Sequence, residues 1–174
     1  MFCYKLSDKK ALESNDFSFE PIKEVAWLFI GIFLTMIPAL QWLEHAAQSP
    51  EISSKITVSV AYWFSGVFSS VLDNAPTYLN VFAVVLSKFG FSIENMSDVK
   101  TFLNSNNIEF LSALSTGAVF FGAMTYIGNG PNFMVKSIAD KAGVKMPSFG
   151  EYIFKYSIPY LLPVLIIVWL VFYF

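Results

Sequence analysis

Residues 69–77 read SSVLDNAPT, and this stretch divides a long uncharged segment of the chain into two parts. The parts are residues 56–72 and 74–87, which together are far too long for one membrane span, while the second alone is too short. Pro76 lacks the backbone N–H that a helix interior needs. We therefore expect a re-entrant helical hairpin over residues 56–88, with half-helices at 56–72 and 77–88 joined by a turn at 73–76.

A second interruption lies in residues 110–135, which carry no charge but contain the sequence GNGPN at 128–132. Two glycines and a proline so close together do not continue a regular helix. Pro131 suits the first turn of a new helix, where its missing N–H is not needed. These residues predict a broken helix over 108–142, with a first half at 108–127, an unwound link, and a second half that begins at Pro131.

Two further uncharged segments, residues 25–43 and 156–174, are each long enough to cross a bilayer as a helix. We expect residues 1–24 to be a cytoplasmic arm or linker, residues 44–55 a polar loop, and residues 92–107 an interfacial segment. The predicted fold class is an all-α integral membrane protein whose membrane domain covers residues 25–174.

The composition supports a membrane protein and excludes several other classes. Hydrophobic residues make up 55% of the 174 residues and charged residues 14%, whereas a soluble domain carries about a quarter charged residues. All eleven cationic residues are lysine, and no basic run predicts a nucleic-acid partner. Cys3 is the only cysteine and His45 the only histidine, so an intrachain disulfide, a thiolate metal cluster and a histidine-cluster zinc site are excluded. We expect the lipid bilayer as a partner and no resident cofactor.

The lysines predict the orientation. In the hairpin topology one side of the membrane receives eight of the eleven lysines, and the other side receives Lys55, Lys88 and Lys100. Lysine-rich loops stay in the cytoplasm. We therefore expect a multi-pass protein of the inner cell membrane with a cytoplasmic N-terminus, a hairpin that opens outward and a C-terminus outside.

Both interruptions are candidate parts of a binding site, because irregular backbone at membrane depth must be buried in protein or line a watery cavity. Such tips can supply carbonyl and side-chain oxygens to Na⁺, while the N-terminus of the following half-helix attracts anions. The Na⁺ candidates are Asp73, Asn74 and Asn129. The wider ion- or substrate-binding set comprises Ser69, Ser70, Asp73, Asn74 and Thr77 from the first interruption, and Thr125, Gly128, Asn129 and Asn132 from the second.

Asp73 is the candidate with the strongest chemical argument for a functional role. A carboxylate at membrane depth is costly unless it is protonated, paired or bound to a cation. A group that exchanges a proton for a cation couples the two ions, so Asp73 is a candidate for proton coupling. The alternative is structural, because Asp-Asn before Ala-Pro is also a common helix start with Asp as the capping residue.

The two motifs resemble those of a known superfamily. SSVLDNAPT at 69–77 is similar to the hairpin-tip signature of the ion-transporter superfamily, and GAMTYIGNGPN at 122–132 to the unwound segment of its broken helix. GIFLTMIPAL at 31–40 is similar to the span that precedes the hairpin. The closest branch is the NhaD-type sodium:proton antiporters and the citrate transporters related to them. The resemblance extends from about residue 17 onward.

The resemblance implies one repeat of an inverted-repeat transporter, with Asp73, Asn74, Thr77, Asn129 and Asn132 as binding positions. It implies a second repeat without the first, so we expect a first-repeat half or a second copy as partner. The leading hypothesis is sodium:proton antiport, in which Asp73 binds Na⁺ and H⁺ in turn. The alternatives are cation-coupled transport of citrate or another carboxylate, and a non-transporting remnant or subunit of a split transporter. An enzyme is not expected, because a second carboxylate for an aspartic dyad is lacking.

Overall fold

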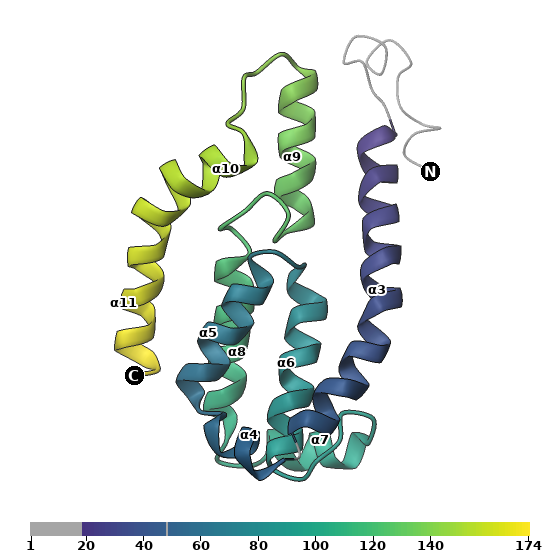
Figure 1. The fold of residues 1–174 in the computed structure, drawn as a ribbon, viewed down its shortest axis with the longest axis vertical. Coiled ribbons are helices and arrows are strands. Elements are labelled where there is room, and N and C mark those ends of the chain that lie inside the picture. The colour runs from purple at the N-terminus through teal and green to yellow at the C-terminus, as the bar shows by residue number, and fades with distance from the viewer. Residues whose placement is uncertain (1–18, 48) are drawn as a thin grey trace.

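The computed structural model describes residues 19–47 and 49–174, and these residues form helices and no strand, which confirms the all-helical prediction. Residues 1–18 of the expected arm at 1–24 lie outside the described residues. Figure 1 shows the helices in chain order: α3 (Glu20–Ala47), α4 (Pro50–Lys55), α5 (Val58–Ser69), α6 (Asn74–Lys88), α7 (Met96–Leu103), α8 (Ile108–Phe121), α9 (Gly130–Lys141), α10 (Phe149–Tyr152), the π-helical turn η1 (Ile153–Leu161) and α11 (Leu162–Phe172).

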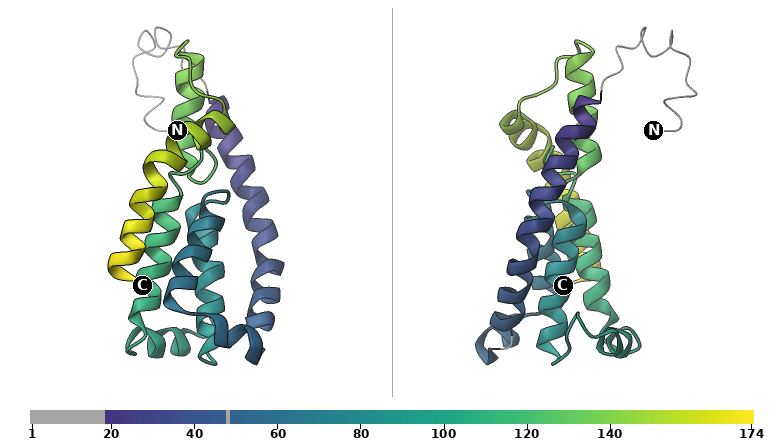
Figure 2. Two further views of the ribbon diagram at one scale, coloured as in Figure 1. Left: turned by 60° about the vertical axis from the view of Figure 1, so that its left-hand side comes forward. Right: turned by 90° about the vertical axis from the view of Figure 1, so that its right-hand side faces the viewer.

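The centre of the molecule is the helical hairpin of α5 and α6, packed against α8. The helix α3 stands on one side of this group, and the continuous helix formed by α10, η1 and α11 stands on the other (Figures 1 and 2). The helices α4 and α7 lie at one end of the molecule, and α9 lies toward the other end. The hairpin turn at 70–73 therefore lies well inside the length of the molecule, beside the link that joins α8 to α9.

Within the described residues, two helical segments are long and apolar enough to cross a membrane, and they cover Val25–Ala47 and Phe149–Phe172. The apolar helices α5 and α8 are shorter, with 12 and 14 residues. At about 1.5 Å per residue each reaches roughly 20 Å, less than the hydrocarbon thickness of about 30 Å. These lengths agree with half-helices, although the membrane depth of the hairpin stays a prediction.

The returning helix of the hairpin begins at Asn74, three residues before the expected start at Thr77. Pro76 is therefore the third residue of α6. It is tolerated there because the first four N–H groups of a helix have no intrahelical partner to lose. The departing helix α5 begins after Thr57, whose side chain accepts a capping hydrogen bond from the Val60 N–H at 3.2 Å.

Two further expected boundaries differ in the structure. The expected polar loop at 44–55 is largely helical, because α3 continues to Ala47 and α4 occupies Pro50–Lys55. The first half of the broken helix was expected to reach residue 127 but ends at Phe121. The residue after this end is Gly122, and a Cβ there would collide with the side chain of Asn74, so the glycine lets α6 approach the end of α8 closely.

The end of the hairpin away from its turn is closed by aromatic packing. Phe102 of α7 is fully buried and contacts the rings of Phe82 and Phe89. The Lys88 ammonium donates hydrogen bonds to the carbonyls of Ser53 and Ile56, at 3.1 and 2.6 Å, and so satisfies the end of α4. α7, in the segment expected to be interfacial, is thus held by a buried ring.

The packing of α5 against α8 depends on two glycines. A Cβ at Gly66 would lie 2.5 Å from the ring of Phe121, and one at Gly117 would overlap the Ser65 hydroxyl and the Tyr62 carbonyl oxygen. Both glycines are buried. The missing side chains allow the two helices to approach closely, as small residues do between membrane helices.

We predict that Gly117→Ala destabilises the protein by about 1–3 kcal/mol, because the new methyl group forces α5 away from α8. The matched control is Gly31→Ala on α3, where a Cβ meets nothing within 4 Å. That change should be neutral or slightly stabilising, because alanine favours a helix over glycine. Thermal unfolding of the detergent-solubilised variants measures both, and equal midpoints would contradict the close-packing interpretation.

Candidate functional site

The structure brings the two interrupted segments into direct contact. The Thr125 hydroxyl of the link at 122–129 donates a hydrogen bond of 2.5 Å to the carbonyl of Ser70 in the hairpin turn. The same oxygen accepts hydrogen bonds from the N–H groups of Ile127 and Gly128, at 3.1 and 3.0 Å. One threonine side chain therefore folds the link back on itself and joins it to the tip of the hairpin.

Asn74 makes a second connection between the tip and the link. One end of its side chain faces the carbonyl oxygens of Gly128 and Ala118, at 3.0 and 2.9 Å. Only the amide nitrogen can donate to two carbonyls, so this end is Nδ2. The Ser69 hydroxyl lies 2.7 Å from the same atom and donates to the Ala118 carbonyl. Asn74 thus ties the first residue of α6 to α8 and to the link.

Asp73 occupies the N-cap position of α6, but its side chain makes no capping hydrogen bond to that helix. Instead Oδ1 accepts a long hydrogen bond of 3.4 Å from the N–H of Gly130, the first residue of α9. The N-terminal end of a helix carries a partial positive charge, which favours a carboxylate. Among residues 19–47 and 49–174, no lysine forms an ion pair with Asp73.

The remaining candidates from the second interruption lie around the start of α9. Asn129 is the N-cap residue, and its carbonyl accepts from the N–H of Asn132 at 3.0 Å. The Asn132 amide reaches the carbonyl of Gly122 at 3.5 Å. Gly128 is buried, and a Cβ there would lie 2.6 Å from the Ser69 carbonyl oxygen, so the link and tip backbones touch at this glycine.

The side of α6 that follows Asp73 carries further polar groups. Thr77 is 2% exposed, and within the described residues its hydroxyl has no hydrogen-bond partner. The same holds for Oδ1 of Asn80, whose nitrogen donates to the Pro76 carbonyl at 2.9 Å. Positions 73, 77 and 80 share one helix face. Asn80 is a polar residue of this face that was not predicted from the sequence. Its position seven residues after Asp73, on the same helix face, was the available signal.

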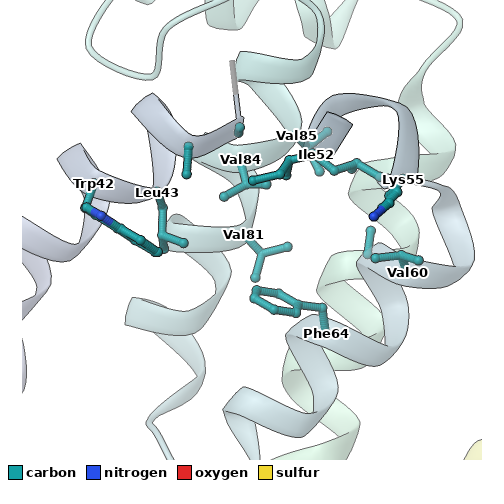
Figure 3. A pocket seen from close by; sticks show the side chains of 13 residues that line it. Trp42, Leu43, Ile52, Lys55, Val60, Phe64, Val81, Val84 and Val85 are labelled. Carbon is teal, nitrogen blue, oxygen red and sulfur yellow. The ribbon is translucent and has the colours of Figure 1, made fainter. Parts of the chain in front are cut away.

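An apolar cavity of about 240 Å³ lies elsewhere, between α3, α4, α5 and α6 (Figure 3). Its lining includes Trp42, Phe64 and Val81, and apart from Lys55 it offers no charged side chain. It is far along the hairpin from the turn at 70–73 and contains none of the candidate residues. The polar contacts between tip and link, rather than this cavity, are the candidate functional site.

Comparison with known proteins gives one match. The profile of a family described as "Putative citrate transport" matches residues 1–173, which is nearly the whole chain. No curated protein and no solved structure matches the chain at significant similarity.

We predict that Thr125→Val destabilises the protein by about 1–3 kcal/mol, because the isosteric side chain leaves the Ser70 carbonyl and two link N–H groups without their partner. Thr125→Ser should retain most of the stability. The matched control is Thr101→Val on α7, whose hydroxyl is exposed and bonds only to the Ser97 carbonyl. Thermal unfolding tests the three variants. Equal losses for the two valine variants would show that the hydroxyl at 125 does not join the link to the tip.

Proposed function

Because the chain belongs to the family described as "Putative citrate transport", we propose that it binds a coupling cation between the hairpin tip and the link and that it transports a carboxylate such as citrate. The family is one of transporters, so the chain is a membrane protein of secondary transport and not an enzyme. The observation that carries the proposal is the contact between two interrupted helical segments, with Asp73 at the point where they meet.

The cation part of the proposal rests on oxygen-bearing side chains of the residues on either side of this contact. The Asp73 carboxylate, the Asn129 side chain and the unpartnered Thr77 hydroxyl are all hard ligands, which small cations such as Na⁺ prefer. Asp73 has no lysine partner in the described part of the chain, so a cation or a proton would compensate its charge. Alternation between the two would couple the movement of H⁺ to that of Na⁺.

The carboxylate part rests on the start of α9. The N-terminus of a broken helix attracts anionic substrate groups in secondary transporters. Here the Gly130 N–H is the group that Asp73 approaches, at 3.4 Å. Protonation of Asp73 or its binding to a cation would leave this helix end available to a substrate carboxylate, with the amides of Asn129 and Asn132 beside it.

Sodium:proton antiport is the second candidate, and one observation favours it. In residues 19–47 and 49–174, no lysine bonds to a polar group of the tip or link, and the chain contains no arginine. Lys136, which lies over the ring of Tyr126, is paired with Asp140. A tricarboxylate would therefore find no lysine bonded to the tip or link, and the lysine beside Tyr126 is already paired, whereas a cation needs no such partner.

The distribution of lysines gives the proposed orientation. Lys141 of α9 forms an ion pair with Glu20 at the start of α3, so these ends lie together. Lys55 and Lys100 belong to α4 and α7 at the opposite end of the molecule (Figure 1). We place the α9 end in the cytoplasm of the inner membrane and the hairpin opening outside. A first-repeat half, or a second copy of the chain, would supply the opposing surface of the site.

We predict that Asp73→Asn abolishes transport while the protein still inserts and folds. The chain is expressed alone and with a first-repeat half in everted vesicles. Two signals are measured, namely uptake of labelled citrate and dissipation of the pH gradient when Na⁺ is added. Asp140→Asn is the control, because it removes only an exposed ion pair worth at most about 1 kcal/mol.

The two signals separate the candidates. Citrate uptake that requires Asp73 supports the carboxylate carrier, and a Na⁺ response without citrate uptake supports the antiporter. Full activity of Asp73→Asn would refute the assigned site under either function.

A further inference from the structure

The C-terminal helix contains a wide turn at the height of the link. The segment η1 (Ile153–Leu161) is π-helical, and its geometry is visible where the Leu162 N–H donates to the carbonyl of Ser157, five residues earlier. Pro159 lies within it and has no N–H to give to the preceding turn. π-helical turns are rare and are frequent at functional sites.

This turn brings two polar side chains into line. Residues five apart in an α-helix point about 140° away from each other, since each residue turns by about 100°. A turn closed by i→i+5 hydrogen bonds has more residues per turn and brings them closer to the same face. Here the Tyr152 hydroxyl donates to the Ala123 carbonyl at 3.1 Å, and the Ser157 hydroxyl donates to the Met124 carbonyl at 2.7 Å.

The two acceptors are consecutive carbonyls of the link, immediately after α8 ends. Carbonyls at a helix end lose their intrahelical partners and must find others, most of all in a membrane. Ser157 is 2% exposed, so its hydrogen bond is shielded from competing water. Tyr126 also stacks on Tyr152, with ring centroids 4.4 Å apart. The C-terminal helix therefore holds one side of the link, while the hairpin tip holds the other side through Thr125.

We propose that Tyr152 and Ser157 are positioning residues, which through the π-helical turn hold the link so that residues 125–129 face the hairpin tip. The effect on ion binding rests on the proposed function, but the effect on the link does not. In the described part of the chain, neither side chain forms a hydrogen bond or a ring contact with the hairpin turn. Their removal should therefore loosen the link and weaken the apparent affinity for the coupling cation, with little effect on the maximal rate.

The first experiment measures the link directly and needs no transport. In a Cys3→Ser background, Ile127→Cys reports the exposure of the link through its rate of labelling by a membrane-permeant maleimide. Ser157→Ala should raise this rate about 5–10-fold, the effect of losing one buried hydrogen bond. Ser157→Thr keeps the hydroxyl and should restore the slow rate. Tyr152→Phe should act like Ser157→Ala, and Tyr160→Phe, on the same turn but 73% exposed, should have no effect.

A second reporter separates positioning from general loosening. Ala83→Cys lies fully buried in α6, away from the link. Its labelling rate should stay unchanged in Ser157→Ala. An equal rise at both reporters, or an Ile127→Cys rate unaffected by Ser157→Ala, would overturn the proposal.

The transport measurement then tests whether the position of the link determines the affinity for the coupling cation. In vesicles that transport, Ser157→Ala should raise the KM for the coupling cation about 5–10-fold and keep the maximal rate within about twofold. A faster labelling of Ile127→Cys without this rise in KM would show that Ser157 has only a structural role. It would reject the proposal that Ser157 positions the ion site. Absence of transport in the parent chain would count against the proposed function alone, because the labelling result stands by itself.

Discussion

The central constraint on this fold is that buried backbone polar groups need hydrogen-bond partners where the chain leaves a helix. Between α8 and α9 the chain leaves the helix for the link at 122–129, and its carbonyls and N–H groups lose their intrahelical bonds. The partners come from three directions. Asn74 bonds from the hairpin, Asn132 from α9, and Tyr152 and Ser157 from the C-terminal helix. The elements that satisfy the link are therefore the same elements that surround the candidate site.

The positions of the two interruptions could be predicted from the sequence, because their causes are local. A charge and a proline in an uncharged segment mark the hairpin turn, and two glycines with a proline mark the link. The boundaries could not be predicted in the same way. The helix α8 ends at Phe121, where the side chain of Asn74, 48 positions earlier, packs against Gly122 in the space that a Cβ would take. Contacts of this kind are tertiary, and no local pattern contains them.

The residues of the candidate site also divide into those that could be predicted from the sequence and those that could not. Asp73 and Asn74 stand out in the sequence because polar groups in an apolar segment need a reason, and both lie at the contact between tip and link. Asp73 holds the N-cap position of α6 but makes no capping hydrogen bond to that helix, because its carboxylate faces the start of α9 instead. Ser157 could not be found from the sequence, because its role depends on a π-helical turn and on a partner 33 positions away.

The glycine contacts between α5 and α8 have a mechanical consequence. Surfaces that meet at Gly66 and Gly117, with a ring or a carbonyl in place of a side chain, resist sliding past each other. The hairpin and α8 should therefore translate or tilt as a single rigid body, and displacement would be absorbed where the backbone is not helical. The link is such a place. The joint that would let a solute pass from one side of the membrane to the other would then be the same short segment that carries the proposed ion site.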